Sequence, residues 1–460
     1  MALVLCAGAL LGALPVLAAA PHPSAPDTAV PAAQPAAPDS ERQRGEALPE
    51  ALMRVPRRFL EEAPRTLMEA PRVATDQTLE AVRWLAKRRQ FTLDGVPYSI
   101  TGLPIFYYSR STGWNYGARI QWADYRRLPY RYKVTLHSLH STANRSDAFF
   151  RIRVPRISGT GFGVEVLLRD RRDIRVRYYG RGNDSRYVAA YTNPRSPRFR
   201  DEDYYMYVLR EPRLAVSLLR HLWGPFNTAA LLGLESADVS PRGSQSYYVD
   251  EGTPDGVKDG VTGFVGLSLS WDTRDDDVIP MRGTLHEWSY ETSRNSVLAL
   301  FFEEIDYRRY TITDARYLPL TPRLNLAHRT IFEVLSGTVP LYAYGELGSM
   351  RPIKGLGGGD SLRGYDTQRF TDNVRFLTNT ELRYHLRSMR LYRQYLELHG
   401  AVFVDTGRVW PDVDALTPTG LHASGGFGLR IYWNADFVIQ LSVALSPEQF
   451  YFPVKYRNIF

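Results

Sequence analysis

Residues 355–365 read GLGGGDSLRGY, and the stretch FVDTG follows at residues 403–407. A loop this rich in glycine can fold back on itself, because glycine accepts positive φ and lets backbones approach closely. Side chains alternate along a strand, so Phe403 and Asp405 share one face of any strand that contains them. An arginine fork and a carboxylate form a directional, charge-assisted pair. We therefore expect the loop to carry Arg363 to Asp405 in the interior of a β structure.

The chain of 460 residues is rich in aromatic residues but is not hydrophobic on average. Phe, Trp and Tyr make up 12% of it, whereas the mean hydropathy is -0.30. Beyond the N-terminal stretch there is no apolar run of about 18 residues, which excludes a helical membrane protein. A search for apolar runs does not detect a transmembrane barrel, because only every second residue of a strand meets lipid. Composition therefore favours one long all-β barrel over several soluble domains.

Alternation at strand length dominates the chain from about residue 98. Residues 437–445 and 265–271 place large apolar side chains at every odd position and mostly small or polar ones between them. About seventeen such segments can be counted, but bacterial single-chain barrels have an even number of strands. The weakest boundary lies at residues 169–173, where one bulged strand explains two short runs. We therefore predict an all-β fold, a 16-stranded antiparallel transmembrane β-barrel.

Long connections and basic residues fit this barrel. The connections at residues 182–203, 239–260 and 337–373 are expected to be extracellular, because periplasmic turns of such barrels are short. The formal net charge is +8, but basic residues alternate with apolar ones instead of clustering. This pattern predicts a charged lumen and no nucleic-acid partner. Outer-membrane lipid and anionic lipopolysaccharide are the expected surroundings of the loops.

Three segments are expected to precede the barrel at residues 98–460. Residues 1–20 resemble a signal peptide, although its usual positively charged start is missing. Residues 21–50 are rich in Pro and Ala and lack periodicity, which predicts a disordered tail. Residues 51–97 predict a short, partly helical periplasmic extension. The single cysteine, Cys6, lies in the signal segment, so no disulfide framework is expected.

Four motifs together resemble one family. SLRGY at residues 361–365 is similar to the tip of the sixth extracellular loop in the BamA/TamA-type outer-membrane surface-antigen superfamily, and FVDTG matches that family's FxDxG strand motif. GLSLSWDTRDDDVIPMRG at residues 266–283 resembles the DTRD…PxRG signature, and NTELRYHL at residues 379–386 resembles the ELR strand. The resemblance covers roughly residues 91–460.

The resemblance implies a lock between an inserted sixth extracellular loop and the barrel lumen, formed by Arg363 and Asp405. The other implied residues of this lock are Gly364, Tyr365, Glu381, Phe403 and Gly407. The implied strand signature consists of Asp272, Arg274, Asp275 and Gly283, and Phe460 corresponds to the C-terminal assembly signal. The alternative is that the arginine lies in a solvated loop while the aspartate joins a general lumen network.

The resemblance further implies a location in the bacterial outer membrane and a role in inserting or translocating protein, or lipid, at that membrane. Implied partners are the barrel assembly machinery that inserts the chain itself and a possible unfolded client or periplasmic protein. Relatives usually carry POTRA domains before the barrel, and residues 51–97 are too short and too rich in proline and charge for one. A passive channel or a structural barrel without a client is the alternative.

No pattern in the chain indicates catalysis, a cofactor or a metal. Ser138 and His140 lie close together, but there is no GxSxG elbow. The nine histidines include none in an HExxH setting, and the acidic run at residues 272–277 is more typical of rim salt bridges than of a calcium loop. We therefore expect neither an enzyme nor a resident metal or cofactor.

Overall fold

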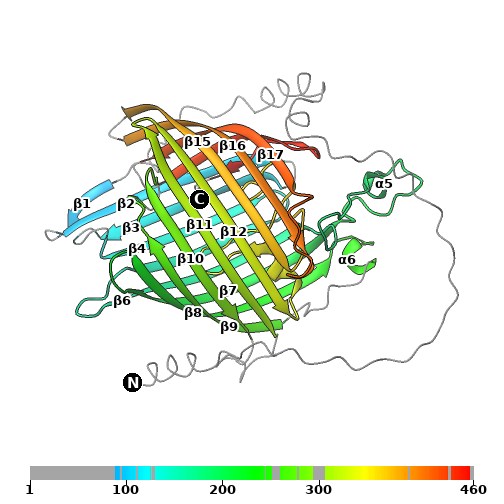
Figure 1. The fold of residues 1–460 in the computed structure, drawn as a ribbon, viewed down its shortest axis with the longest axis horizontal. Coiled ribbons are helices and arrows are strands. Elements are labelled where there is room, and N and C mark those ends of the chain that lie inside the picture. Colours follow the sequence, from blue (N-terminus) through cyan, green and yellow to red (C-terminus); the bar gives the residue numbers. More distant parts are fainter. Residues whose placement is uncertain are drawn as a thin grey trace. The chain divides into compact units, whose positions relative to one another are not determined.

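One antiparallel sheet accounts for most of the chain, and apart from the last two short fragments each strand pairs with the next strand of the sheet along the sequence (Figure 1). The computed structural model describes residues 89–455 except 94–95, 110–111, 125, 127–129, 244, 251–259, 277–278, 294–305, 392–393 and 434–436. The expected signal segment, the disordered tail, the helical part of the extension and Phe460 lie outside the described residues.

The main sheet is built from strands whose bounds follow chain order. They are β1 (Arg89–Leu93), β2 (Val96–Ser109), β3 (Gly113–Asp124), β4 (Tyr132–Ser141), β5 (Ser146–Val154), β6 (Phe162–Arg177), β7 (Met206–His221), β8 (Phe226–Pro241), β9 (Gly260–Asp272), β10 (Gly283–Thr292), β11 (Tyr307–Thr321), β12 (Leu324–Gly337), β15 (Val374–Leu391), β16 (Gln394–Trp410), β17 (His422–Trp433), β18 (Phe437–Leu445), β19 (Phe450–Tyr451) and β20 (Val454–Lys455).

The main sheet has seventeen strands once two fragments are joined, and the sixteen from β2 onward match the predicted barrel. β19 and β20 both pair with β18 and together form one interrupted last strand. The strands from β2 to β12 number eleven, those from β15 to β18 number four, and the interrupted strand completes sixteen. β1 is an additional short strand on the edge of β2, from Arg89↔Ile100 to Leu93↔Val96. β2 begins at Val96, two residues before the predicted start of the barrel, and β1 lies within the segment predicted as a partly helical extension.

The ambiguous segment at residues 169–173 belongs to a single bulged strand. β6 is continuous, and its pairing with β7 shifts register between Asp173 and Val176. The extra residues in β6 bend the strand without ending it. This confirms the interpretation that reduced the strand count from seventeen to sixteen.

The sheet carries charged side chains on its buried face and large apolar side chains on its exposed face, the reverse of a soluble protein. Along β12 every second residue is buried, and the buried set includes Arg329 and Glu333. The other face exposes large apolar side chains such as Leu267 on β9, Val402 on β16 and Phe427 on β17. A charged interior and an apolar exterior are what a transmembrane barrel requires.

Long connections gather at one end of the strands and short turns at the other. The connection between β6 and β7 contains α5 (Ala189–Thr192), and that between β8 and β9 contains α6 (Tyr247–Asp250), as Figure 1 shows. The connection between β12 and β15 is the sixth at this long-loop end, counted from β2–β3. It holds η1 (Leu341–Gly345) and the small sheet of β13 (Glu346–Leu347) and β14 (Ile353–Lys354). No helix in the described part of the chain is long and apolar enough to span a membrane.

Candidate functional site

The sixth loop, residues 338–373, is buried against the inner face of the sheet. Its apolar side chains pack on the wall in a cluster of Leu347, Leu356, Leu362, Tyr365 and Phe370 with Ile331, Leu377 and Val409. The loop also reaches strands far apart in the sheet, because Glu346 pairs with Arg213 of β7 while Asp360 pairs with Lys455 of β20. A loop in contact with inner-face side chains from β7, in the middle of the sheet, to β20, at its end, lies within the barrel that the sheet forms.

Arg363 is the central anchor of this loop. Its Nε lies 2.6 Å from Oδ2 of Asp405 and its Nη2 lies 2.7 Å from Oδ1, so the pair is bidentate. The backbone N–H of Arg363 donates to the same carboxylate, and Nη1 donates to Oε1 of Glu381 at 2.7 Å. The guanidinium carbon lies 3.4 Å from the ring centre of Phe403. The structure thus places the implied lock residues together, and all three charged side chains are fully buried.

Glu381 joins this anchor to two further arginines that sequence reasoning did not single out. Its carboxylate accepts from Nε of Arg383 at 2.8 Å and from Nη2 of Arg430. Both arginines are buried, on β15 and β17. Arg383 stands two residues after Glu381 and therefore shares its face, which is a signal present in the sequence. Arg430 depends on the register of β17 against β16, and no local pattern predicts that.

Asn379 and Arg329 complete the other side of the anchor. The amide of Asn379 donates to Oδ1 of Asp405 at 2.8 Å and to the carbonyl of Ser361 at 2.7 Å. Arg329 donates to the Asn379 side chain and to the carbonyl of Asp360. Barrel strands therefore hold the loop through its backbone as well as through Arg363. This fixes the path of the loop on both sides of the arginine.

Two glycines let the loop approach the wall closely. Gly364 has φ +91°, and a Cβ there would lie 3.2 Å from the side chains of Ser424 and Ser446. A Cβ on Gly407 would lie 2.8 Å from Leu356 of the loop. Next to Gly364, the hydroxyl of Tyr365 donates to the carbonyl of Ala423 at 3.1 Å. Burial raises the pKa of this hydroxyl, so it remains protonated as a donor.

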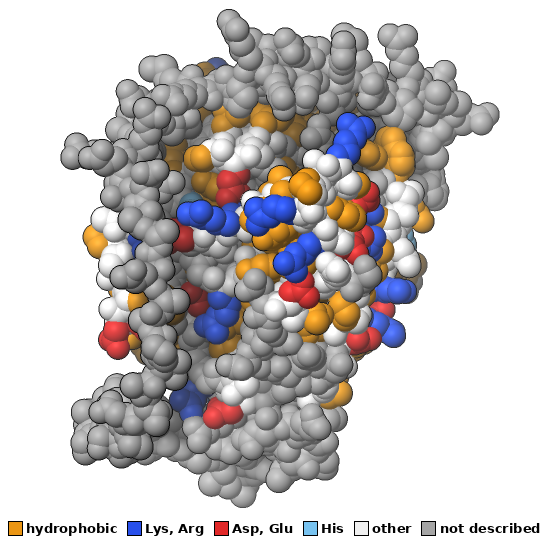
Figure 2. Space-filling view, turned by 90° about the vertical axis from the view of Figure 1, so that its right-hand side faces the viewer, with side chains coloured by type: hydrophobic (Ala, Val, Ile, Leu, Met, Phe, Trp, Pro, Cys, Tyr) orange, Lys and Arg blue, Asp and Glu red, His pale blue; other side chains and the backbone are white. Residues whose placement is uncertain are grey.

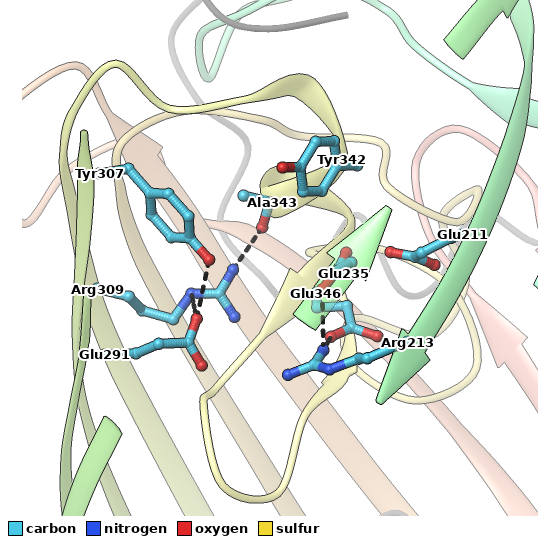
Figure 3. A pocket seen from close by; sticks show the side chains of 9 residues that line it. All are labelled: Glu211, Arg213, Glu235, Glu291, Tyr307, Arg309, Tyr342, Ala343 and Glu346. Atoms are coloured by element: carbon cyan, nitrogen blue, oxygen red, sulfur yellow. Dashed lines mark hydrogen bonds and ion pairs between the residues drawn. The ribbon is translucent and has the colours of Figure 1, made fainter. Parts of the chain in front are cut away.

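A second charged network holds the first half of the loop. Arg375 of β15 donates to Glu333 and to the loop carbonyls of Tyr344 and Glu346. Nearby, Arg309 of β11 donates to the carbonyl of Ala343 at 2.9 Å (Figure 3). The loop is therefore held by cations from several strands.

Figure 3 shows how acidic side chains of the loop and wall converge on a small cavity. Arg213 of β7 donates to Glu346 at 3.0 Å, and Nη1 of Arg213 lies 3.5 Å from Glu235. The hydroxyl of Tyr307 donates to Glu291 at 3.0 Å. The cavity has a volume of about 10 Å³, enough for roughly one water molecule. Around this cavity the side chains of the loop and of the wall pack closely.

The strand signature forms a short turn between β9 and β10, far along the chain from the lock. Arg274 pairs with Asp272 through two hydrogen bonds of 2.9 and 2.8 Å. The carboxylate of Asp275 accepts from the backbone N–H of Met281. Gly283 has φ +98°, and a Cβ there would lie 2.2 Å from a carbonyl oxygen. These contacts shape the turn, and the structure does not bring the signature residues to Arg363.

The long connection between β6 and β7 docks on the sixth loop. Arg369 of the sixth loop donates to the side chain and carbonyl of Ser185 and to Glu448, which follows β18. Gly182 and Thr371 form an isolated bridge between the same two loops. Figure 2, which looks onto the long-loop end, shows basic and acidic side chains intermixed with apolar ones. Loops from three parts of the chain are therefore tied together at this end.

Comparison with known proteins agrees with this architecture. The profile of the Omp85 superfamily domain matches residues 200–446, more than half of the chain. No curated protein matches the sequence. Among solved structures, BamA from Haemophilus ducreyi lacking POTRA domains 1-3 is 14% identical with a TM-score of 0.46. The match covers 86% of this chain and 80% of that one. CdiB from Escherichia coli is 13% identical with a TM-score of 0.47, with coverage of 83% and 67%.

The matched residues include both halves of the anchor, Arg363 in the sixth loop and Asp405 on β16, together with Glu381 on β15. The family match thus covers the strands and the buried sixth loop that form the anchor. The chain belongs to the Omp85 superfamily of bacterial outer-membrane β-barrel proteins.

Proposed function

We propose that this barrel assists the insertion or translocation of protein, or of lipid, at the outer membrane. The superfamily works in protein insertion and secretion at that membrane, together with partner proteins. The observation that carries the proposal is the sixth loop fixed inside the lumen by Arg363, Asp405 and Glu381. In this proposal the anchored loop braces the interior while material passes at the barrel wall.

The sixth loop held inside the lumen supports this role over that of an open pore. Loop side chains around Arg363 are buried, and the loop is bonded to strands from β7 to β20. The link from Arg369 to Ser185 adds a second layer at the long-loop end. A solute would have to displace these contacts, so bulk diffusion through the interior is disfavoured.

The seam between the first and last strands supports passage at the wall. β19 and β20 pair with β18 through only two residue pairs each, and Pro453 lies between them. Proline cannot donate to a ladder. Within the described residues neither fragment has a ladder with β1 or β2. We infer that this sparsely bonded seam is where a strand or a lipid is accommodated.

Deletion of the gene tests the proposal directly. The outer-membrane proteome and the lipid composition would be quantified against wild type, with complementation by the wild-type chain and by Arg363→Ala. Loss of a defined set of proteins, restored only by the wild-type chain, would support a role in assembly or secretion. Altered lipid alone would support lipid movement. No change in either would overturn the proposal.

A passive channel or a structural barrel without a client is the alternative role. A steady large conductance in a planar bilayer would favour the channel, whereas a small flickering conductance fits a barrel filled by its sixth loop. We further propose that the chain is not an enzyme and that the barrel assembly machinery inserts it. Its client and any periplasmic partner would be identified by the proteome comparison.

A further inference from the structure

Three donor residues meet on the inner face of one hairpin, at its short-turn end. His385 lies on β15, and Glu397 and His399 lie on β16. His385 pairs directly with His399 in the antiparallel ladder, and Glu397 precedes His399 by two residues, so all three share a face. One donor atom from each residue lies within 4.8 Å of the other two. The functional site described above uses none of them.

We propose that His385, Glu397 and His399 form a binding site for a divalent transition-metal ion, of which Zn²⁺ is the expected type. Two imidazoles and one carboxylate are a common zinc donor set, with bonds of roughly 2.0 to 2.2 Å. Two donors bound tetrahedrally at such lengths lie about 3.4 Å apart. The donor atoms lie within 4.8 Å of one another, and Nε2 of His399 and Oε2 of Glu397 are already 3.2 Å apart, so side-chain rotations suffice to close the set on an ion.

The hydrogen bonds of the cluster leave donor atoms free for a metal. The ring of His385 uses Nε2 to contact Oγ of Ser388 at 2.8 Å, which leaves its Nδ1 as the metal-binding atom. A hydrogen bond from the second ring nitrogen to an outer partner is the usual way to orient a metal-bound imidazole. Nε2 of His399 already lies 3.2 Å from Oε2 of Glu397. A metal would replace that contact with two bonds to one ion.

The burial of His399 fixes the ring that would bind the ion. Its side chain is nearly fully buried, and its Nδ1 has no hydrogen-bond partner among the described residues. The edge of Tyr432 packs against the ring, with centroids 4.8 Å apart, and holds its plane. The fixed ring keeps Nε2 turned toward Glu397, where the ion would bind, and Nδ1 takes no part in this site. Glu397 and His385 remain partly exposed, so an ion can enter and a water can complete the set.

Nearby arginines limit the affinity without preventing binding. Arg383 shares the inner face of β15, and Arg430 lies directly opposite His399 on β17. Both donate to Glu381, which offsets part of their charge. The remaining repulsion favours an ion held by directional bonds to nitrogen over one held mainly by charge. Ca²⁺ and Mg²⁺, which prefer oxygen ligands, are therefore expected to bind much more weakly.

Zinc binding by the full chain in detergent micelles tests the proposal, with a purification tag that contains no histidine. Titration calorimetry is expected to show one Zn²⁺ per chain, and Zn²⁺ is expected to raise the temperature of heat-modifiable gel migration. His385→Ala and Glu397→Gln should each weaken binding by at least about tenfold, which corresponds to loss of a ligand. His286→Ala is the matched control, because His286 pairs with Asp314 on other strands and should leave binding unchanged.

Cobalt gives a readout that does not depend on any variant. The wild-type barrel with Co²⁺ should show the visible absorption of a tetrahedral site with nitrogen ligands, and Zn²⁺ should abolish that absorption. Absence of Zn²⁺ binding by the wild-type barrel at millimolar concentration would overturn the proposal. Binding that survives both His385→Ala and Glu397→Gln would overturn it as well.

Discussion

Arg363 shows how one residue can fix a long loop. It donates to two carboxylates and through its own backbone N–H, and its guanidinium stacks on Phe403. Burying such a group removes it from water, so the whole network contributes less to stability than its bonds suggest. The network instead determines the path of the loop, because only one path allows Arg363 to reach all of these partners. We expect variants here to change loop position more than they change the barrel's strand content.

Asp405→Ala should loosen the sixth loop and lower the stability of the barrel. Removing the carboxylate leaves Arg363 buried with only Glu381, and an uncompensated buried charge costs about 3 to 5 kcal/mol. Heat-modifiable migration should shift to lower temperature, and protease should cleave within residues 338–373. Asp170→Ala is the control, since Asp170 and its partner Arg210 are both mostly exposed and 3.9 Å apart. Equal behaviour of the two variants would contradict the assigned role of Asp405.

Gly364→Ala should weaken the same anchor by a different mechanism. A non-glycine residue at φ +91° is strained by roughly 1 to 3 kcal/mol, and the new methyl group would press on Ser424 and Ser446. We expect a lower transition temperature on gel migration and slower refolding into micelles. Gly161→Ala serves for comparison, because its Cβ would meet nothing within 4 Å. Wild-type behaviour of Gly364→Ala would show that the loop shifts without penalty.

At the scale of strands, the sequence was most informative where side chains alternate between lipid and lumen. Residues 265–271 of β9 and most of β18 alternate with a period of two, and both strands were predicted. β6 was ambiguous, because a bulge near Asp173 breaks that period although the ladder continues. β1 lies in a segment expected to be helical in part. The mixed composition of that segment gives no sign that β1 pairs with the neighbouring strand β2. Local pattern thus predicts a strand only while its period holds.

The candidate site was predictable only as far as its motifs reached. Arg363 and Asp405 stand in recognisable motifs, whereas Arg430 and Arg329 are arginines among many in alternating strands. Their place in the network is set by the ladders of β16 with β17 and of β12 with β15. Register of this kind depends on the whole sheet, because a slip by one residue would turn every side chain to the other face. The His385, Glu397 and His399 cluster escaped prediction for the same reason.

Arg369→Ala should separate two loops while leaving the barrel intact. Arg369 links the sixth loop to Ser185 and Glu448, and these bonds lie outside the ladders. Hydrogen exchange should rise in residues 178–205, with little change in the temperature of gel migration. Arg198→Ala is the control, because Arg198 bonds Tyr191 within its own connection. Unchanged exchange after Arg369→Ala would show that the bridge of Gly182 with Thr371 suffices to hold the loops.

At the scale of the whole molecule, the lumen is organised as two charged networks with the sixth loop between them. One surrounds Arg363 on β15, β16 and β17, and the other joins the loop to β7, β11 and β12. Apolar contacts such as Leu356 with Val409 fill the space between them. The loop is therefore part of the core of the barrel. Ion flow through the interior should depend on the loop far more than on the outer wall.

Replacement of residues 341–371 by a short Gly/Ser linker should convert a small conductance into a steady large one. The loop's contacts with Arg213, Arg309 and Arg375 would be lost, and the freed arginines would face water in the lumen. Wild-type chain in a planar bilayer should give small, flickering currents, and Arg363→Ala should give an intermediate, noisy state. Arg210→Ala, on the exposed outer face, should match wild type. A steady large current from the wild-type chain would favour the passive channel, because it would mean that solutes bypass the anchored loop.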